Sequence, residues 1–493
     1  MKTAYILLGA ALLLGGTALT SCDDKLSELP KQYKVDGNVV VDQKSAQTLL
    51  NGMYYTYVKS GTDNYDQQST MCDMYYSVLP ADFAGIYKYY QGDYMFEQHG
   101  STSVTRYSSY FWTTHYSTVN AANCVIDQVT VASDSWFAGN KKKEILGEAY
   151  GMRALAFYNL LRLCGYSWDV NSPYGILLRT QSSKVSNSSM PRSSVKDTYA
   201  QILSDCDYAI QNAPSENEHY YITRWFAEGL KARVLMLRGA DGDYAAAAEL
   251  AKDVIDNSPY ALEDNVMDVF KTKGVDSQEV IFGIKPYDKQ TNVYENYFYR
   301  GEPQYLPTDN FVALFNDDPR KDKVLGTANV RNIHWNDDGT YSWVYEPAAC
   351  IAKFVDIVNN TTNTITESQY DMRLTEMYLL RAEALVRSGG DMAEARSLLK
   401  TVLTHAGYTD VAFVDAATSS DALLKLIFDE DIRNLFGEGG REIDFMLRFG
   451  SIATDFNSQY ENAQYNVFPI PTEEFQYNSK LSKDMQNPGY SAE

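Results

Sequence analysis

The sequence predicts a mostly helical fold in which paired helices form a scaffold, with long irregular loops and a few short β-hairpins between them. Two observations indicate the helices. Apolar residues recur every three or four positions over many segments, and tight polar turns separate several of these segments. A third observation indicates the loops, because the other intervals are long and rich in Tyr, Gly, Asn and Asp. Their aromatic content argues against disorder.

The helical spacing is clearest over residues 145–163, where one apolar face can be followed along the whole segment. That face consists of Ile145, Ala149, Met152, Ala156, Leu160 and Leu163. The expected helices cover, in order, residues 46–58, 111–129, 145–163, 195–210, 226–237, 244–255, 374–386, 393–402, 422–436 and 442–448.

Two of the helix pairs resemble each other. Polar turns at 239–243 and 388–391 join them, and we expect Asp243 and Asp391 to cap the second helix of each pair. Residues 243–260 align without a gap to residues 391–408, with small residues that let helices approach closely. This is the pattern of tetratricopeptide-like repeats. Since only two copies are visible, we expect embedded helix pairs rather than a regular solenoid.

The longest irregular intervals are residues 60–110 and 287–346. Within the second interval, residues 333–346 alternate in polarity around an Asp338-Gly339 pair, which predicts a β-hairpin. Loops of this length in a packed protein usually carry function.

Residues 1–21 form a leader. Lys2 is followed by an uncharged apolar run from Ala4 to Leu19, and the leader ends in Leu-Thr-Ser before Cys22. This resembles the lipobox of a bacterial lipoprotein, so we expect cleavage after Ser21 and acylation of Cys22. An ordinary secretory leader is the alternative. Several acyl chains would anchor the protein stably to a membrane.

The composition excludes several classes of protein. A net charge of −21 argues against nucleic-acid binding, which requires a basic surface. No segment after residue 21 has the length of apolar sequence that spans a bilayer. The scattered histidines and the cysteines without a Cys-x-x-Cys pair argue against a transition-metal site. A single disulfide is still an alternative. We expect Cys124, Cys164 and Cys206 to be buried thiols.

We expect no cofactor and no catalysis. Residues 336–339 and 315–318 carry enough oxygen atoms for a structural Ca²⁺, but turn formation explains both, and neither has EF-hand spacing. Carboxylates and arginines occur together at several places and are expected to form ion pairs, although a glycosidase would also need two carboxylates. These groups are Glu148 with Arg153, Arg381 with Glu383, and Glu438 with Arg441, Glu442 and Asp444.

Motifs throughout the chain resemble the SusD/RagB lipoproteins of Bacteroidetes nutrient uptake. The most characteristic is Phe-Pro-Ile-Pro at 468–471 followed by Gln-Asn-Pro-Gly-Tyr at 486–490. The segments that carry the remaining resemblance are 111–127, 145–165, 190–210, 223–239, 317–323, 372–389 and 437–450. One departure is residues 167–180, where the family usually has a short Gly-Val-Pro turn. Asp23 and Asp24 also resemble the surface-export signal of Bacteroidetes lipoproteins.

The resemblance implies an outer-membrane, cell-surface lipoprotein that captures nutrients for a SusC-like TonB-dependent transporter and acts as its hinged lid. It also implies a helical scaffold of tetratricopeptide-like units with an irregular ligand face. We expect a SusD-like N-terminal region over 22–215 and a C-terminal region over 216–493, together forming one composite domain.

Aromatic loop residues are the candidate ligand contacts, because sugars have flat apolar faces that stack on exposed rings. The candidates are Tyr87, Tyr89, Tyr90, Tyr94, Tyr297, Trp335 and Trp343. Packing or transporter contact is the alternative for each of them. Trp112, Tyr116, Tyr158 and Trp225 lie within helices and are expected in the core.

The sequence therefore predicts a non-enzymatic protein that binds oligosaccharides and delivers them to the transporter. Peptide binding, as in the RagB branch, is the alternative. A surface glycoside hydrolase is a third reading.

Overall fold

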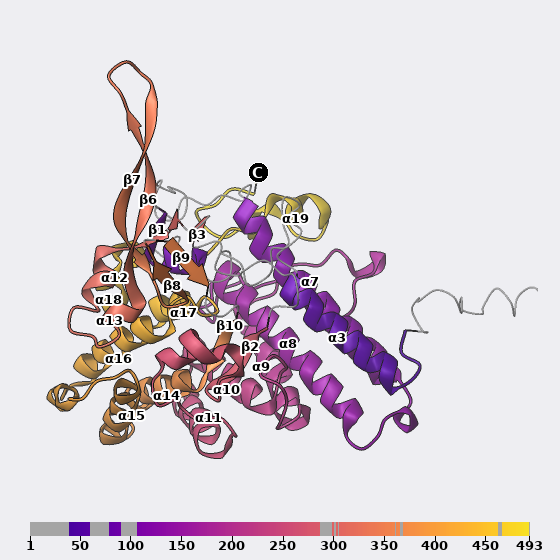
Figure 1. The fold of residues 1–493 in the computed structure, drawn as a ribbon. Coiled ribbons are helices and arrows are strands. Elements are labelled where there is room, and N and C mark those ends of the chain that lie inside the picture. Colours follow the sequence, from indigo (N-terminus) through magenta and orange to yellow (C-terminus); the bar gives the residue numbers. More distant parts are fainter. Residues whose placement is uncertain are drawn as a thin grey trace, which may run out of the picture.

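The computed structural model describes residues 39–59, 78–89, 106–285, 298–299, 302–303, 305–359, 361–364, 368–461 and 466–492. Long helices make up most of these ranges, and the strands form two-stranded pairs (Figure 1). The predicted fold class, mostly helical with paired helices, is confirmed.

The α-helices are α3 (Gln43–Lys59), α5 (Leu79–Phe83), α7 (Arg106–Val131), α8 (Lys141–Cys164), α9 (Val195–Asn212), α10 (Arg224–Arg238), α11 (Asp243–Asn257), α12 (Asp309–Ala313), α13 (Lys321–Val324), α14 (Leu374–Ser388), α15 (Met392–His405), α16 (Ser420–Leu435), α17 (Arg441–Arg448), α18 (Ser451–Phe456) and α19 (Thr472–Tyr477). Short helical turns are η1 (Asp134–Trp136), η2 (Val185–Asn187), η3 (Val269–Lys273, a π-turn), η4 (Gly274–Asp276), η6 (Ala412–Ala416), η7 (Ser458–Glu461) and η9 (Lys483–Met485).

The strands are β1 (Tyr87–Tyr89), β2 (Val280–Ile284), β3 (Phe298–Tyr299), β4 (Glu302–Pro303), β5 (Tyr305–Pro307), β6 (Leu325–Trp335), β7 (Tyr341–Ile351), β8 (Val355–Val358), β9 (Thr361–Thr364) and β10 (Gln369–Arg373). They pair antiparallel as β1–β5, β2–β10, β3–β4, β6–β7 and β8–β9.

Helix α8 lies at the centre of the N-terminal half, packed against α7 on one side and α9 on the other. Its predicted apolar face is buried along its whole length, and so are polar residues on its other faces, among them Glu148, Arg153 and Arg162. Gly147 permits the close approach of the chain after α9, because a Cβ there would lie 2.3 Å from the Ala213 nitrogen. The helix is therefore a core helix rather than a surface one.

Helices α10, α11, α14, α15 and α16 continue the scaffold, each packed against its neighbour. The predicted cap at Asp391 is confirmed, since its carboxylate accepts from the Ala393 nitrogen at 2.7 Å. The predicted cap at Asp243 is wrong by one position. Gly242, in the left-handed conformation with φ 83°, caps α11. Asp243 is the first helical residue, and its carboxylate pairs with Arg238 at 2.6 Å.

The predicted hairpin is confirmed as β6–β7, the longest strand pair in the described part of the chain. Its register runs from Leu325 opposite Ile351 to Trp335 opposite Tyr341. Gly339 supplies the positive φ of 79° in the turn, and the Asn336 nitrogen donates to the Thr340 carbonyl at 2.8 Å. Figure 1 shows the hairpin projecting far beyond the helices beside it.

The thiols of Cys164 and Cys206 are buried, as predicted, and Cys350 is buried as well. Burial raises the pKa of Cys164 to about 12. Cys124 is only half-buried, which corrects the prediction for that residue.

None of the helices in the described ranges has both the length and the apolar character needed to cross a bilayer. The predicted leader and Cys22 lie outside those ranges. The division at residue 215 stays a prediction.

Candidate ligand-binding surfaces

The aromatic residues predicted to bind ligand differ in how exposed they are in the structure, and some of them lie outside the described residues. Tyr90, Tyr94 and Tyr297 lie outside the described residues. Tyr87 is 1% exposed, with its ring edge-on to the rings of Phe311 and Phe436. It packs in the core, which contradicts its prediction as a ligand contact.

Tyr89 is half-buried. Its ring centroid lies 5.3 Å from that of Tyr305, its partner across the β1–β5 pair. One side of this ring is therefore used in packing. Among the members of the predicted set that the structure describes, Trp335 and Trp343 are the exposed rings.

Trp335 and Trp343 lie on one face of the β6–β7 hairpin. Side chains two residues apart share a face of a strand, and directly paired residues share it across the hairpin. The pairing therefore places six side chains together, which we call the aromatic face. It consists of Arg331, Ile333, Trp335, Tyr341, Trp343 and Tyr345.

The rings of the aromatic face form a continuous series. The centroid of Tyr341 lies 5.6 Å from that of Trp335 and 6.0 Å from that of Trp343. The guanidinium carbon of Arg331 lies 4.3 Å from the Trp343 centroid, which is cation–π distance. Trp335 is 66% exposed and Trp343 is 42% exposed. A contiguous exposed apolar patch of this kind usually marks an interaction site.

The opposite face of the hairpin is mainly polar. It carries Asn332, His334, Ser342 and Glu346, with the Asn332 amide donating to the Glu346 carboxylate at 3.0 Å. Because large rings occupy one face and polar groups mostly the other, the hairpin is amphipathic. Only its aromatic face has the character of a recognition surface.

The base of the hairpin is fixed in the core, where Ala328, Cys350 and Ile351 are buried. Just beyond β7, the Lys353 ammonium group donates to the Phe436 carbonyl at 2.8 Å and to the Glu438 carboxylate at 2.6 Å. Burial lowers the pKa of Lys353 to about 8. A firm base beneath an exposed tip positions the aromatic face with little freedom at its root.

A second aromatic surface lines a pocket between α3, the loop joining α9 to α10, and β2. We call it the tyrosine pocket, and its volume is about 230 Å³. Its lining consists of Tyr54, Tyr55, Tyr57, Val58, Tyr220, Tyr221, Phe282, Gly283, Ile284 and Lys285. Sequence reasoning missed it, because its walls come from segments far apart in the chain.

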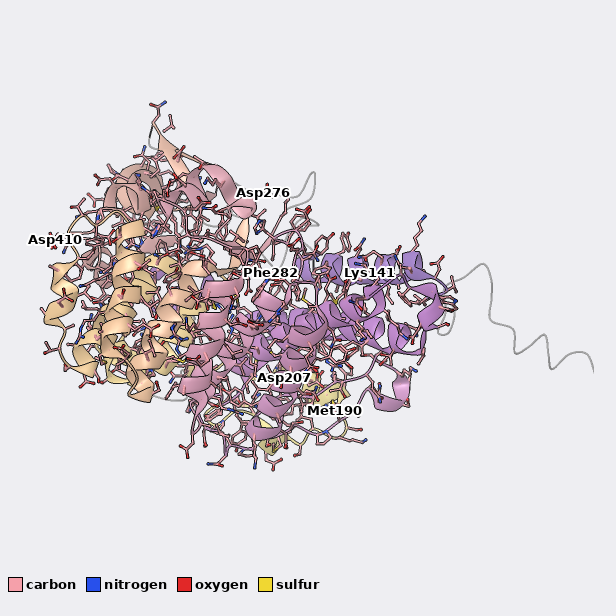
Figure 2. All side chains as sticks on the ribbon, turned by 90° about the horizontal axis from the view of Figure 1, so that it is seen from below. Lys141, Met190, Asp207, Asp276, Phe282 and Asp410 are labelled. Carbon is pink, nitrogen blue, oxygen red and sulfur yellow. The ribbon has the colours of Figure 1, made fainter. Side chains whose placement is uncertain are left out.

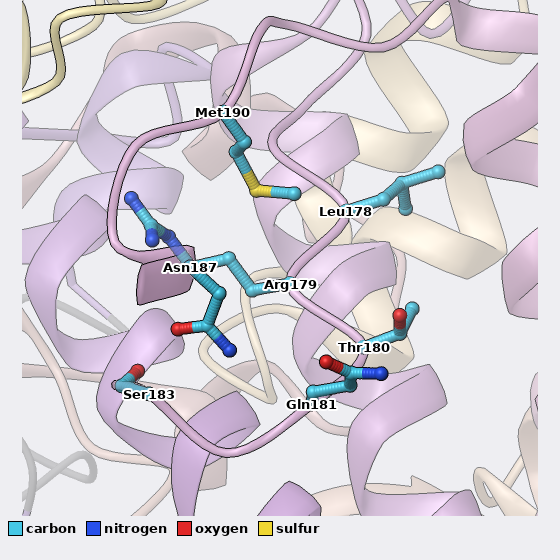
Figure 3. A pocket seen from close by; sticks show the side chains of 7 residues that line it. All are labelled: Leu178, Arg179, Thr180, Gln181, Ser183, Asn187 and Met190. Atoms are coloured by element: carbon cyan, nitrogen blue, oxygen red, sulfur yellow. The ribbon is translucent and has the colours of Figure 1, made fainter. Parts of the chain in front are cut away.

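A smaller pocket lies inside the loop of residues 178–190 (Figure 3). Its volume is about 80 Å³, enough for a few water molecules but not for a sugar ring. Asn123 shapes this loop by donating to the carbonyls of Arg179 at 2.7 Å and Gln181 at 3.0 Å. The Arg179 guanidinium pairs with Glu474 at 3.0 Å. These contacts indicate a structural loop.

A third hollow, about 460 Å³, lies beside the base of the hairpin and mixes both signs of charge. Lys271 lines it, but its ammonium group donates to the carbonyls of Ala352 at 2.6 Å and Val355 at 2.8 Å. The nearby Asp356 carboxylate lies 3.5 Å from the same ammonium group. Of the two lysines that line this hollow, Lys271 is thus engaged within the protein, and Lys323 is the other.

The carboxylates considered for catalysis form internal contacts. Asp205, rather than Glu148, is the ion-pair partner of Arg153, at 2.7 Å. Glu148 instead accepts from the Tyr54 hydroxyl at 2.7 Å. Arg441 pairs with Asp444 at 3.0 Å. The predicted ion pair of Glu148 with Arg153 is therefore wrong, whereas Arg441 pairs with Asp444 inside its predicted group.

Arg381 and Glu383 of the second group, and Glu438 of the third, pair with residues outside their own groups. Arg381 pairs with Glu394 at 2.7 Å, and Glu383 pairs with Arg448 at 2.7 Å. Glu438 pairs with Arg373 at 2.7 Å. These carboxylates bind arginines within the scaffold instead of facing an open cleft.

The expected core aromatics lie in or against the core. Trp112, Tyr158 and Trp225 are buried, and Tyr116 is half-buried. The Tyr158 hydroxyl donates to Asp444 at 2.9 Å.

In the described part of the chain, no group of three or more His, Cys, Asp or Glu side chains is arranged to hold a metal ion. Asp338, in the turn considered for Ca²⁺, accepts from the Thr340 hydroxyl at 2.6 Å.

Two family models together match the chain over most of its length. One, described as "Starch-binding associating with outer membrane", matches residues 30–236, and the other, "SusD family", matches residues 287–490. A SusD-like protein from Bacteroides ovatus is 30% identical over 182 residues, which is 35% of this chain and 32% of that relative. The chain thus matches about a third of that relative's length. A SusD-like protein from Formosa agariphila is 23% identical, covering 78% of this chain and 80% of the relative.

Solved structures share the fold. A SusD superfamily protein from Bacteroides thetaiotaomicron superimposes with a TM-score of 0.71 at 22% identity, covering 91% of this chain and all of that one. A SusD-like carbohydrate binding protein from Bacteroides vulgatus does so with a TM-score of 0.68 at 20% identity, covering 90% of this chain and 98% of that one. The motifs, the fold and the two family matches agree, and the chain belongs to the SusD/RagB family.

Proposed function

We propose that this protein is a cell-surface lipoprotein that captures oligosaccharides and passes them to a SusC-like TonB-dependent transporter, on which it acts as a lid. The observation that carries the binding proposal is the aromatic face of the hairpin. Trp335 and Trp343 present exposed rings in series with Tyr341, on a hairpin fixed at its base.

The chemistry of that face suits a sugar chain. Each pyranose has an apolar C–H face that stacks on a ring, and neighbouring hydroxyls need donors and acceptors at the edge. Tyr341 and Tyr345 supply phenol groups beside the indoles, and Arg331 supplies a guanidinium. The projecting strands let several sugar units contact the same face. We propose that binding requires neither a cofactor nor a covalent step.

Family membership supports the role beyond binding. The family model that matches residues 30–236 is described by its association with the outer membrane, and a structural relative is a carbohydrate binding protein. In this proposal, Cys22 carries the lipid that holds the protein at the outer membrane. Capture of the oligosaccharide by the aromatic face would precede closure of the lid over the transporter.

A binding screen tests the proposal. The soluble form beginning at Asp23 is titrated by calorimetry with polysaccharides, oligosaccharides and peptides. Binding to a glycan supports the proposal, whereas binding to peptides alone would assign the protein to the RagB-like branch. New reducing ends in the glycan after incubation would identify a hydrolase instead. A pull-down of the native lipoprotein in detergent tests the proposed transporter partner. Absence of a large β-barrel protein from that pull-down would contradict the proposal.

A further inference from the structure

We propose that the tyrosine pocket is a second saccharide-binding site that holds one neutral sugar ring. The buried side chains of Tyr54, Tyr57 and Phe282 line its floor, and Phe282 is labelled in Figure 2. Its volume of about 230 Å³ is below the range of drug-sized ligand sites, so it suits a single ring.

The walls present rings at different angles. The Tyr220 and Tyr221 centroids lie 4.9 Å apart, and Tyr221 stands edge-on to Tyr54 with centroids 4.8 Å apart. In the described part of the chain, the hydroxyls of Tyr220 and Tyr221 make no hydrogen bond with the protein. A ligand with an apolar face and hydroxyls at its edge would use both the rings and these phenol groups.

Hydrogen bonds and close packing within the protein hold the floor of the pocket in place. The Tyr54 hydroxyl donates to the buried Glu148 at 2.7 Å and accepts from the Ile222 nitrogen at 2.9 Å. Gly283 lies so close to the neighbouring strand that a Cβ would be 2.6 Å from the Gln369 carbonyl oxygen. A preformed floor reduces the ordering that binding requires.

Charge selects among the ligands that aromatic pockets accept. A cage of tyrosines attracts organic cations, but the Lys285 ammonium already lies 5.8 Å from the Tyr220 centroid, so a cation of the protein itself uses that ring. Asp276, also labelled in Figure 2, lies 3.2 Å from that ammonium and balances its charge. The net charge of −21 further disfavours an anion. A neutral sugar needs neither a free ring for a cation nor an excess positive charge for an anion, so it suits this pocket best.

The test uses ligand-observed saturation-transfer NMR on the full-length protein. The probes are the methyl glycosides of glucose, galactose and mannose, with glucuronate and tetramethylammonium as charged probes. We expect transfer to at least one neutral glycoside, reduced at least fivefold in Tyr220→Ala and partly in Tyr220→Phe. Tyr477→Ala, which removes a ring that is 81% exposed on α19, should leave the signal unchanged. Thermal unfolding checks that each variant is folded.

The results separate this site from the hairpin. The signal should persist in a Trp335→Ala/Trp343→Ala variant, whatever the outcome of the proposal for the hairpin. Signals from glucuronate or tetramethylammonium alone would overturn the assignment of the ligand class. Absence of transfer to every neutral glycoside, or an equal signal in folded Tyr220→Ala, would overturn the site itself.

Discussion

The carboxyl of Glu148, beneath the tyrosine pocket, makes folding stability depend on pH in a way that a single substitution exposes. Glu148 is buried in α8, and the Tyr54 hydroxyl donates to it. Burial raises the pKa of this carboxyl from 4.5 to about 7, although the Tyr54 hydrogen bond opposes the rise. The folded protein thus holds this proton more tightly than the unfolded chain does.

The sign and size of the effect follow from that difference. A raised carboxyl pKa contributes stability that is complete below about pH 4.5 and is lost as the pH rises through about 7. The loss amounts to about 3 kcal/mol, at about 1.4 kcal/mol for each tenfold change in proton affinity. Glu148→Gln keeps the shape and accepts from Tyr54 without ionising. It should match the wild type at low pH and exceed it by up to about 3 kcal/mol above pH 8.

Urea unfolding of both proteins at several pH values from about 4.5 to 8.5 measures this difference. Other buried carboxyls, such as Glu442, titrate in both proteins and cancel in the comparison. Tyr54→Phe, which removes the opposing hydrogen bond, should extend the pH range of the loss upward. A stability difference between Glu148→Gln and wild type that stays constant across the range would refute the reasoning.

Two further predictions concern packing and a buried ion pair. Gly147→Ala should destabilise the protein by about 1–3 kcal/mol in calorimetry, because its Cβ would meet the Ala213 nitrogen. Gly52→Ala, at an exposed helix position with nothing within 4 Å, should instead stabilise it by about 0.5–1 kcal/mol. Arg153→Met should cost about 3–5 kcal/mol in urea unfolding at neutral pH, since it leaves the Asp205 carboxylate buried without its cation. A loss below 1 kcal/mol would contradict that account.

The helices could be predicted from the sequence because their apolar residues repeat with the helical period. The face from Ile145 to Leu163 is buried as expected. The burial of Glu148 and Arg153 on the same helix could not be predicted, because it depends on the side chains that α3, α7 and α9 bring to the other faces. Charged residues inside a helix normally lie on its solvent face. The sequence alone therefore favours an exposed position for Glu148 and Arg153, which are in fact buried.

The hairpin was predictable because its turn and its alternation are local. The sequence predicts Trp335 and Trp343 as ligand contacts but does not single out Tyr341 and Tyr345, although the same alternation places them on that face. Tyr87 was misjudged because a tyrosine-rich segment reads as a surface loop until the packing of Phe311 on it is known.

The tyrosine pocket lay beyond sequence reasoning for a different reason. Tyr57, Tyr220 and Phe282 come from three separate parts of the chain, and only the fold brings them together. No motif links them in the sequence.

The central claim is that the aromatic face of the hairpin captures glycan, and calorimetry on matched variants tests it most directly. The glycan that binds best in the screen is titrated into wild type, Trp335→Ala, Trp343→Ala and Trp136→Ala. Trp136 is the control, a tryptophan 41% exposed in η1, outside the aromatic face.

We expect each hairpin variant to lose at least about 2 kcal/mol of binding free energy, or roughly 30-fold in affinity, as a central aromatic contact does. Folding stability should stay within about 0.5 kcal/mol of wild type, since both side chains are exposed. Trp136→Ala should bind like wild type. Equal affinity in all four proteins would contradict the claim and move glycan capture away from the hairpin.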